Sequence, residues 1–207
     1  PDGTQVLYTA KIKDTAFNNF LCDNFDADYD GIVSAMEAAD IEEMKIDRNR
    51  YSGISSLHGV EMFTSLRKLS VSGQNIAALD LSENPELTEV VCDNNPLKSL
   101  NISECRKLKR LYCQNTELES INLTGCTTLE ELFLFGSRLT GLDIGRMPAL
   151  RTLDCQSNRL SGELDLSGCG ALIQVNCKGN SALERLILPS GSTARVIKDE
   201  GTEVILK

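Results

Sequence analysis

The sequence predicts an α/β-type solenoid, in which stacked coils build a parallel β-sheet along one side. The first observation is an apolar pattern that occurs six times, at steps of 21, 21, 21, 21 and 22 residues. The pattern is leucine, then leucine or valine three residues later, then leucine, valine or cysteine two residues after that. The second is a motif later in the unit, which reads LDLSEN, LNISEC, INLTGC, LDIGRM and LDLSGC. Units this short bury their apolar side only by stacking on neighbours. The six copies begin at Leu66, Leu87, Leu108, Leu129, Leu150 and Leu172.

These units resemble leucine-rich repeats, whose consensus L-x-x-L-x-L-x-x-N-x-L is matched closely from Leu87 to Leu97 and from Leu150 to Leu160. The resemblance implies a right-handed superhelix with the parallel sheet on its concave face. The ninth position is polar throughout, and we expect its side chain to hydrogen-bond turn backbone inside the coil. Gln74 fits this role least well, because it is one methylene longer than asparagine. The ninth-position residues are Gln74, Asn95, Thr116, Ser137, Asn158 and Asn180.

Residues 1–45 are expected to form a helical N-terminal cap over the first coil. In DTAFNNFLCDNF, Asp14 can cap a helix whose apolar residues recur on one face. A degenerate first repeat follows, with Ile41, Met44 and Ile46 on one face, and leads into ISSLHGVEMF. That phrase resembles the opening repeats of internalin-like leucine-rich proteins. The apolar helix residues are Phe17, Phe20, Leu21 and Phe25.

Residues 26–37, DADYDGIVSAME, match the 12-residue calcium loop of an EF-hand. Gly31 at the sixth position allows the sharp turn that points alternate carboxylates inward. We expect a structural Ca²⁺ that stiffens the cap, rather than a sensor, because the motif is single. The alternative is that Ser34 and Glu37 form only a capping box and the aspartates are ordinary loop residues. The expected ligands are Asp26, Asp28, Asp30, the carbonyl of Ile32 and Glu37.

The remaining chain divides into the repeats, 46–188, with about six to seven coils of 21–22 residues, and a C-terminal cap, 189–207. The extra residue of the 22-residue step lies in RLSGELDL, and we interpret it as a one-residue loop insertion that leaves the strand position unchanged. The period is lost after LERLILPSG, and two apolar runs flank the turn sequence DEG. A β-hairpin that closes the last coil is the simplest interpretation.

Seven of the eight cysteines fall into two columns of the repeat. Four of these cysteines take the third apolar position of the strand, which Val71 and Leu134 occupy in other coils. The other three lie three residues before the first leucine of the next repeat. Vertical neighbours are close enough for a disulfide, but in-register side chains point the same way, so we expect buried thiols that pack as small hydrophobes. Disulfides or a metal are the alternatives. The columns are Cys92, Cys113, Cys155 and Cys177, and Cys105, Cys126 and Cys169.

The concave face is the expected binding surface. A column is one position of the repeat, read from coil to coil. At the third position the charge alternates, beginning with Lys68 and Glu89, and we interpret this column as lateral ion pairs that support the register. The fifth and seventh columns gather three of the ten aromatic residues in the middle coils. Such clusters often mark interaction sites; alternatively they only stabilise the sheet or are covered by a neighbouring subunit. The expected ligand-binding residues are Val91, Tyr112, Phe133, Phe135, Arg110, Glu131 and Asp154.

Composition excludes several function classes. The 207 residues are 41% hydrophobic and 25% charged, as in ordinary globular proteins. A net charge of −9 argues against nonspecific nucleic-acid binding, which needs basic residues. His58 is the only histidine, so the chain offers almost no histidines for a catalytic triad or for a metal site with several histidine ligands. No apolar run approaches the roughly 18–20 residues of a membrane span, and no leader is seen. We therefore expect a mature or trimmed chain, for which a lipid anchor on a missing N-terminal segment is an option.

Together these features favour a noncatalytic binding module, extracellular or on a cell surface, that recognises a protein or a glycan through the concave face. The resemblance to internalin-like and Bacteroides-type surface leucine-rich proteins implies the same. A structural spacer is the first alternative. A carbohydrate-active enzyme is less favoured. An acid or its amide recurs at the same position of each coil, which indicates a solvated face rather than a general acid and base. That column is Asp80, Asn101, Asn122, Asp143 and Asp165.

Overall fold

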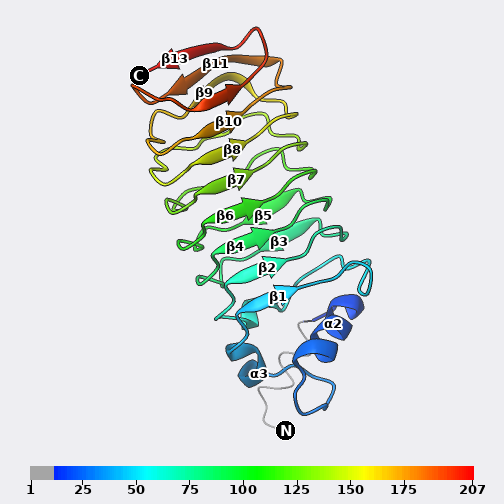
Figure 1. Cartoon of the computed structure of the whole chain (residues 1–207). Coiled ribbons are helices and arrows are strands. Elements are labelled where there is room, and N and C mark those ends of the chain that lie inside the picture. The colour runs from blue at the N-terminus through cyan, green and yellow to red at the C-terminus, as the bar shows by residue number, and fades with distance from the viewer. Residues whose placement is uncertain (1–11) are drawn as a thin grey trace.

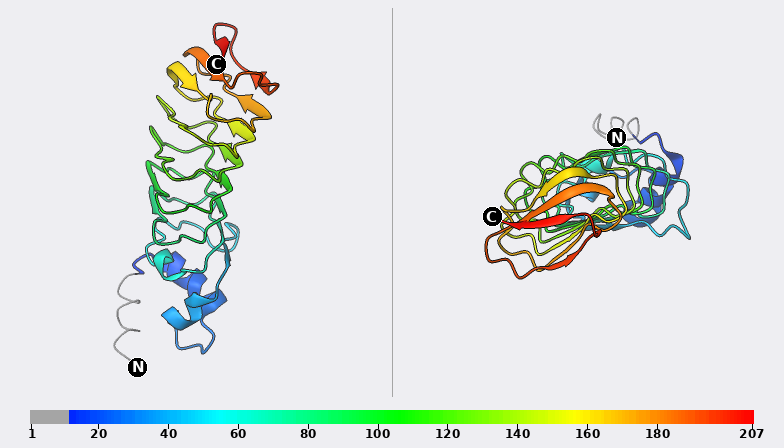
Figure 2. Two further views of the ribbon diagram at one scale, coloured as in Figure 1. Left: turned by 90° about the vertical axis from the view of Figure 1, so that its left-hand side faces the viewer. Right: turned by 90° about the horizontal axis from the view of Figure 1, so that it is seen from above.

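The computed structural model describes residues 12–207, which form an elongated stack of coils with helices at the N-terminal end (Figure 1). Along the stack runs an eight-stranded sheet in which every neighbouring pair is parallel. Viewed down the long axis, the coils superimpose (Figure 2). The solenoid and its parallel sheet are confirmed. The strands in spatial order are β1 (Glu43–Lys45), β2 (Lys68–Ser70), β4 (Glu89–Val91), β6 (Arg110–Tyr112), β7 (Glu131–Phe133), β8 (Thr152–Asp154), β10 (Gln174–Asn176) and β12 (Arg195–Ile197).

The opposite side of each coil carries shorter sheets and turns. Here β3 (Ala78–Asp80) pairs with β5 (Ser99–Asn101), and β11 (Ala182–Leu188) lies between β9 (Ser161–Asp165) and β13 (Glu203–Leu206). All of these pairs are parallel. Strands in successive coils are therefore stacked on both sides of one continuous apolar core.

The alternation of apolar and polar residues explains why each short strand forms. In β6, Leu111 is fully buried while Arg110 and Tyr112 lie outward, and Cys113 just after it is buried again. Adjacent strands pair at the expected offset, for example Leu111 with Leu132. The leucine columns thus set both the register and the direction of the core.

The amides at the ninth position hydrogen-bond turn backbone inside the coils, as predicted, whereas the hydroxyls of Thr116 and Ser137 hydrogen-bond to each other at 2.7 Å. The Asn158 amide donates to the carbonyl oxygens of Leu134 at 2.8 Å and Cys155 at 3.1 Å, and its Oδ1 accepts from the N–H of Leu139 at 3.0 Å. Asn95 and Asn180 make the corresponding bonds in their coils. Gln74 fits better than predicted, because its longer side chain reaches back to Tyr51 O while accepting from Ile54 N.

The N-terminal cap is built on α2 (Thr15–Phe25), α3 (Ala35–Ala39) and the 3₁₀ helix η1 (Val60–Met62). Asp14 caps α2 by accepting from Phe17 N at 2.9 Å, and also accepts from the N–H groups of Ser55 and Ser56. The fully buried Asn84 donates to carbonyl oxygens of Val60 and Phe63, which ties η1 to the first regular coil. The predicted helix cap is therefore confirmed over the described residues, whereas residues 1–11 of the predicted domain 1–45 lie outside them.

The predicted C-terminal β-hairpin is wrong. β12 pairs in parallel with β10 and β13 pairs in parallel with β11, so the two segments belong to opposite sides of one more coil. Asp199 accepts from the N–H groups of Gly179 and Asn180, and the buried Thr202 donates to Leu183 O. These bonds fix the DEG segment as a coil turn. The step from Val175 to its register partner Val196 is still 21 residues. This step was hard to recognise in the sequence because the segment lacks the leucines of the repeat pattern.

All eight cysteines are free in the described part of the chain, and the seven in the two columns are buried. The thiol of Cys92 lies 3.4 Å from Tyr112 O, and that of Cys105 lies 3.4 Å from Leu81 O, so each donates to the backbone of an adjacent coil. Burial raises the pKa of Cys105 to about 12 and that of Cys177 to about 11. The columns therefore pack as neutral thiols, as predicted.

Candidate functional site

The outward side of the eight-stranded sheet carries an aromatic pair at its centre. The register places Tyr112 of β6 directly beside Phe133 of β7. Their ring centroids are 5.1 Å apart and the ring planes differ by 14°, so the rings stack across the strands. Because the separation follows the direction from strand to strand, each ring covers one face of the other.

The phenol of Tyr112 is held by a carboxylate on the neighbouring strand. Its hydroxyl donates to Glu131 Oε2 at 2.5 Å. Partial burial raises the pKa of Tyr112 to about 12, and the hydrogen bond and negative charge of Glu131 act in the same direction. The phenol therefore stays protonated at physiological pH and fixes the position of Glu131.

The other residues predicted for this surface surround the pair. Val91 lies beside Tyr112 in register, and Asp154 lies beside Phe133. The Asp154 carboxylate accepts from Gln156 N at 3.1 Å and from Asn176 Nδ2 at 3.2 Å. Phe135 is half-buried two residues beyond Phe133. We define the aromatic patch as Val91, Tyr112, Phe133 and Phe135 with the flanking Arg110, Glu131 and Asp154.

The charged third column is only partly arranged as predicted. Arg110 Nη1 lies 3.0 Å from Glu89 Oε2, and Lys68 Nζ lies 3.9 Å from Glu43, so lateral ion pairs are present. The hydrogen bond to Glu89 raises the pKa of Arg110. Glu131, however, takes the phenol of Tyr112 as its hydrogen-bond donor. This bond joins the charged column to the aromatic patch, and sequence spacing alone gave no sign of it.

Asp93 is a half-buried acid on the same face that the predicted set omitted. Its Oδ1 accepts from Gln114 N at 2.8 Å. Burial raises the pKa of this carboxyl, although the bond from Gln114 opposes the shift. Its seventh-column position was the only available signal, since the sequence shows no burial.

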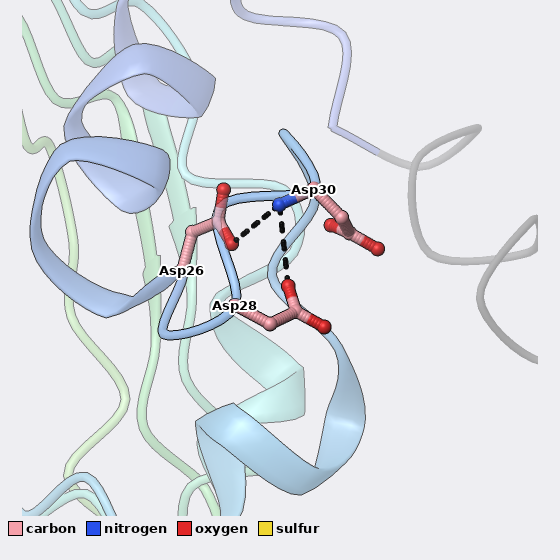
Figure 3. A group of neighbouring side chains, drawn as sticks. All are labelled: Asp26, Asp28 and Asp30. Atoms are coloured by element: carbon pink, nitrogen blue, oxygen red, sulfur yellow. Dashed lines mark hydrogen bonds between the residues drawn. The ribbon is translucent and has the colours of Figure 1, made fainter.

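The acidic loop gathers three carboxylates between α2 and α3 (Figure 3). One oxygen from each of Asp26, Asp28 and Asp30 lies within 4.8 Å of the others. Asp26 accepts from Gly31 N at 2.8 Å and from Asp30 N at 3.2 Å, and Asp28 also accepts from Asp30 N. Gly31 has φ of 86°, which allows the turn that the motif requires. The donor set of oxygens within one tight loop fits a hard divalent cation.

Glu37 also performs the structural role that was the alternative interpretation. It forms a capping box with Ser34, and its Oε1 accepts from Ala27 N at 2.7 Å across the loop. Partial burial raises the pKa of Glu37, but the hydrogen bonds from Ser34, Ala27 and Asp28 outweigh this and lower it. The hydrogen bond from Asp30 N is the largest single influence on Asp28 and lowers its pKa, but slight desolvation and the neighbouring carboxylates together raise the pKa above its usual value. The loop therefore concentrates negative charge.

The column of acids and amides opposite the sheet is used for turns. In Asp80, Oδ1 accepts from Ser82 N at 3.0 Å, and this bond contributes most to the lowered pKa of the carboxyl. Asn122 accepts from Thr124 N and Asp165 accepts from Ser167 N in the same way. Asn101 and Asp143 also accept from the backbone two residues on, and Asn101 donates to Asp80 of the preceding coil, so every side chain of the column takes part in turn hydrogen bonds.

Within residues 12–207, no helix is long and apolar enough to cross a membrane.

No family model and no curated protein matches this chain. Solved structures do. The functional domain of InlJ from Listeria monocytogenes, which includes a cysteine ladder, superimposes with a TM-score of 0.75 at 23% identity; the match covers 93% of this chain and 43% of that one. An internalin, InlF, of the same organism gives 0.53 at 16% identity, covering 97% and 70%. Internalin C2 gives 0.50 at 18% identity, covering 97% and 96%. The chain thus has the leucine-rich-repeat fold of these internalins.

Proposed function

We propose that this leucine-rich-repeat solenoid is a noncatalytic binding module that works outside the cell or on its surface. The observation that carries the proposal is the aromatic patch on the outward side of the sheet. The sheet offers a broad rigid surface, and the patch places apolar side chains at its centre with charged groups around them. A central aromatic cluster with a polar rim is the usual composition of a protein-recognition site.

The stack of Tyr112 on Phe133 favours a protein ligand over a glycan. Each ring already covers one face of the other, so those two faces are not free to receive a sugar ring. Ring edges remain for contact with side chains, and Arg110 and Asp154 beside the rings offer charges of opposite sign. The proposed partner is therefore a protein that presents apolar groups flanked by charge, and a glycan is the second possibility.

The acidic loop is proposed to hold one structural Ca²⁺ through Asp26, Asp28, Asp30, the carbonyl of Ile32 and Glu37. When bound, the ion would neutralise carboxylates that otherwise repel one another, and would hold the turn between α2 and α3. Its role is to stiffen the cap, because the loop is single and lies at the end of the solenoid away from the aromatic patch. A calcium-rich exterior agrees with the proposed location.

A protein and glycan array, probed in calcium with the labelled chain, tests these assignments. Binding to a protein supports the leading proposal, and binding only to glycans supports the second possibility. The absence of any ligand would contradict both and favour a structural spacer. Release of sugars from the glycans would instead indicate an enzyme.

A further inference from the structure

Two acids flank the aromatic side chains at the centre of the sheet. Asp93 follows β4, two residues beyond Val91, and Asp154 ends β8. Between these two strands lie β6 and β7, which carry Tyr112 and Phe133 (Figure 1). The fifth and seventh columns are thus acidic at both ends of this stretch and carry no basic residue within it. Their other members in these four coils are Val91, Tyr112, Gln114, Phe133, Phe135 and Gln156.

Neither carboxylate has a cationic partner. Asp93 accepts from Gln114 N at 2.8 Å. Asp154 accepts from Gln156 N at 3.1 Å and from Asn176 Nδ2 at 3.2 Å. In the part of the chain that the structure describes, neither acid forms an ion pair. The hydrogen bonds therefore hold both carboxylates in place and leave their negative charge uncompensated.

The one cation of the aromatic patch does not offset them. Arg110 pairs with Glu89 at 3.0 Å. The hydrogen bond from Arg110 to Glu89 raises the pKa of the guanidinium, and the negative charges of Glu89 and Glu131 act in the same direction. Two carboxylates therefore share this guanidinium. With Asp93 and Asp154, four carboxylates stand against one guanidinium around the aromatic side chains, which leaves a net charge of −3.

Asp93 has the most to gain from a cation. Its side chain is half-buried, and burial raises the pKa of the carboxyl although the bonds from Gln114 oppose the shift. A pKa raised by burial means that the charged form has lost hydration that its hydrogen bonds do not replace. A cation from a partner would restore a favourable interaction without displacing an existing ion pair.

We propose that this surface binds a protein segment that carries two cationic side chains on either side of an apolar centre. One cation would meet Asp93 and the other Asp154, while the apolar residues between them contact Tyr112 and Phe133. This inference rests on the proposed function, since it specifies the partner of the same surface. It makes Asp93, which lies just outside the aromatic patch, a residue that determines specificity.

The spacing of the two acids sets the spacing of the two cations. Three strand-to-strand steps of about 4.8 Å and a two-residue offset along the strand put the Cα atoms of Asp93 and Asp154 roughly 16 Å apart. An extended peptide covers that distance in about five residues. Arginine is favoured over lysine, because a guanidinium can bind a carboxylate through two parallel N–H groups. The expected segment therefore has two arginines about five residues apart with apolar residues between them.

Synthetic peptides of three designs test this inference by fluorescence anisotropy. Each labelled 12-residue peptide has leucine and phenylalanine at its centre, flanked at its fourth and ninth positions by arginine, glutamine or glutamate. The arginine peptide should bind the 207-residue chain about tenfold or more tightly than the glutamine peptide, and the glutamate peptide should bind most weakly. Raising the salt concentration should weaken the arginine peptide most, because salt screens exposed charges.

Removing the two charges one at a time locates the contacts. Asp93→Asn and Asp154→Asn should each weaken the arginine peptide about three- to tenfold and leave the glutamine peptide unchanged. Both variants keep an oxygen that can accept the same backbone bond. Asp165→Asn is the matched control, because Asp165 also accepts from the N–H two residues on, at 2.8 Å, but lies on β9 at the opposite side of the coil. It should bind the arginine peptide as the original chain does.

Three results would overturn the inference. They are equal affinity for the three peptides, no binding of any peptide up to about 1 mM, and undiminished affinity for the arginine peptide when Asp93 and Asp154 are both changed to asparagine. The proposed function is tested separately by a protein captured on the array. Binding of that protein that needs Tyr112, Phe133 and Phe135 but neither acid would support the proposed function and contradict this inference.

Discussion

Tyr112 stacks on Phe133 across two neighbouring strands, and its hydroxyl donates a hydrogen bond to Glu131 on the same strand as Phe133. The two contacts hold the ring in one orientation on the outward side of the sheet. A side chain ordered in this way loses little conformational freedom on binding, which favours recognition. The same contacts also stabilise the sheet, so recognition and stability must be separated by experiment.

The titration of Tyr112 should be displaced from that of an ordinary tyrosine. We expect a pKa of about 12 in the folded chain, against about 10 for a free side chain. Because the folded pKa is raised, this stabilisation is present below about pH 10 and is lost as the pH rises toward about 12. NMR of ring-labelled tyrosine measures it, with Tyr112→Phe to assign the signal. Glu131→Gln should lower the pKa of Tyr112 by removing a negative charge, and an unchanged pKa in that variant would contradict the contribution assigned to Glu131.

Tyr112→Phe should separate the phenol from the ring. The stack remains, and one hydrogen bond is lost, so unfolding free energy should fall by about 0.5–1.5 kcal/mol. Phe133→Ser removes the stack itself, so it should cost more. Denaturant unfolding measures both, and equal losses would show that the stacking contributes little.

The buried amide of Asn158 should be among the most sensitive polar positions. Asn158→Ala leaves the N–H of Leu139 and the carbonyl oxygen of Leu134 without their partner, at a cost of about 1–3 kcal/mol for each buried group left unsatisfied. Cys155 O keeps the hydrogen bond from Asn180. Asn122→Ala is the matched control, because Asn122 is exposed and accepts one bond within its own turn. Its effect should stay within about 0.5 kcal/mol. Similar losses in both variants on denaturant unfolding would contradict the internal role.

Cys113 should behave as a packing residue. Cys113→Val should change the unfolding free energy by less than about 1.5 kcal/mol, since valine and leucine occupy this column in other coils. Cys113→Ser buries a hydroxyl in the same place and should cost about 1–3 kcal/mol. Thiol labelling of the native chain should reach Cys22, the one cysteine that is not fully buried, before the other seven. Rapid labelling of Cys113 would contradict the structure.

Calcium should raise the melting temperature relative to chelator if the acidic loop binds it. At a free concentration 100 times the dissociation constant, the expected gain is about 2.7 kcal/mol. Asp28→Asn removes a proposed ligand and should reduce the shift, whereas Asp40→Asn makes the same change at an exposed residue beyond α3 and should not. An unchanged melting temperature at millimolar calcium would argue against the site.

The repeat fold could be predicted because leucines and valines recur at a fixed step and each marks one inward direction. Individual contacts could not. Glu131 has both Arg110 and Tyr112 on the neighbouring strand, and only the side-chain conformations show that it bonds to the phenol. The predicted hairpin is wrong because DEG has the sequence of a hairpin turn, whereas the hydrogen bonds of Asp199 and Thr202 join this segment to residues about one coil earlier in the chain.

The most direct measurement of the central claim compares ligand affinity between two variants. Tyr112, Phe133 and Phe135 are changed together to serine; the control is Met36→Ser with Ile173→Ser, which removes exposed apolar side chains elsewhere. Circular dichroism confirms that each remains folded. For a protein captured on the array, the triple variant should lose binding while the control keeps the affinity of the original chain. Undiminished affinity in the folded triple variant would contradict recognition through the aromatic patch.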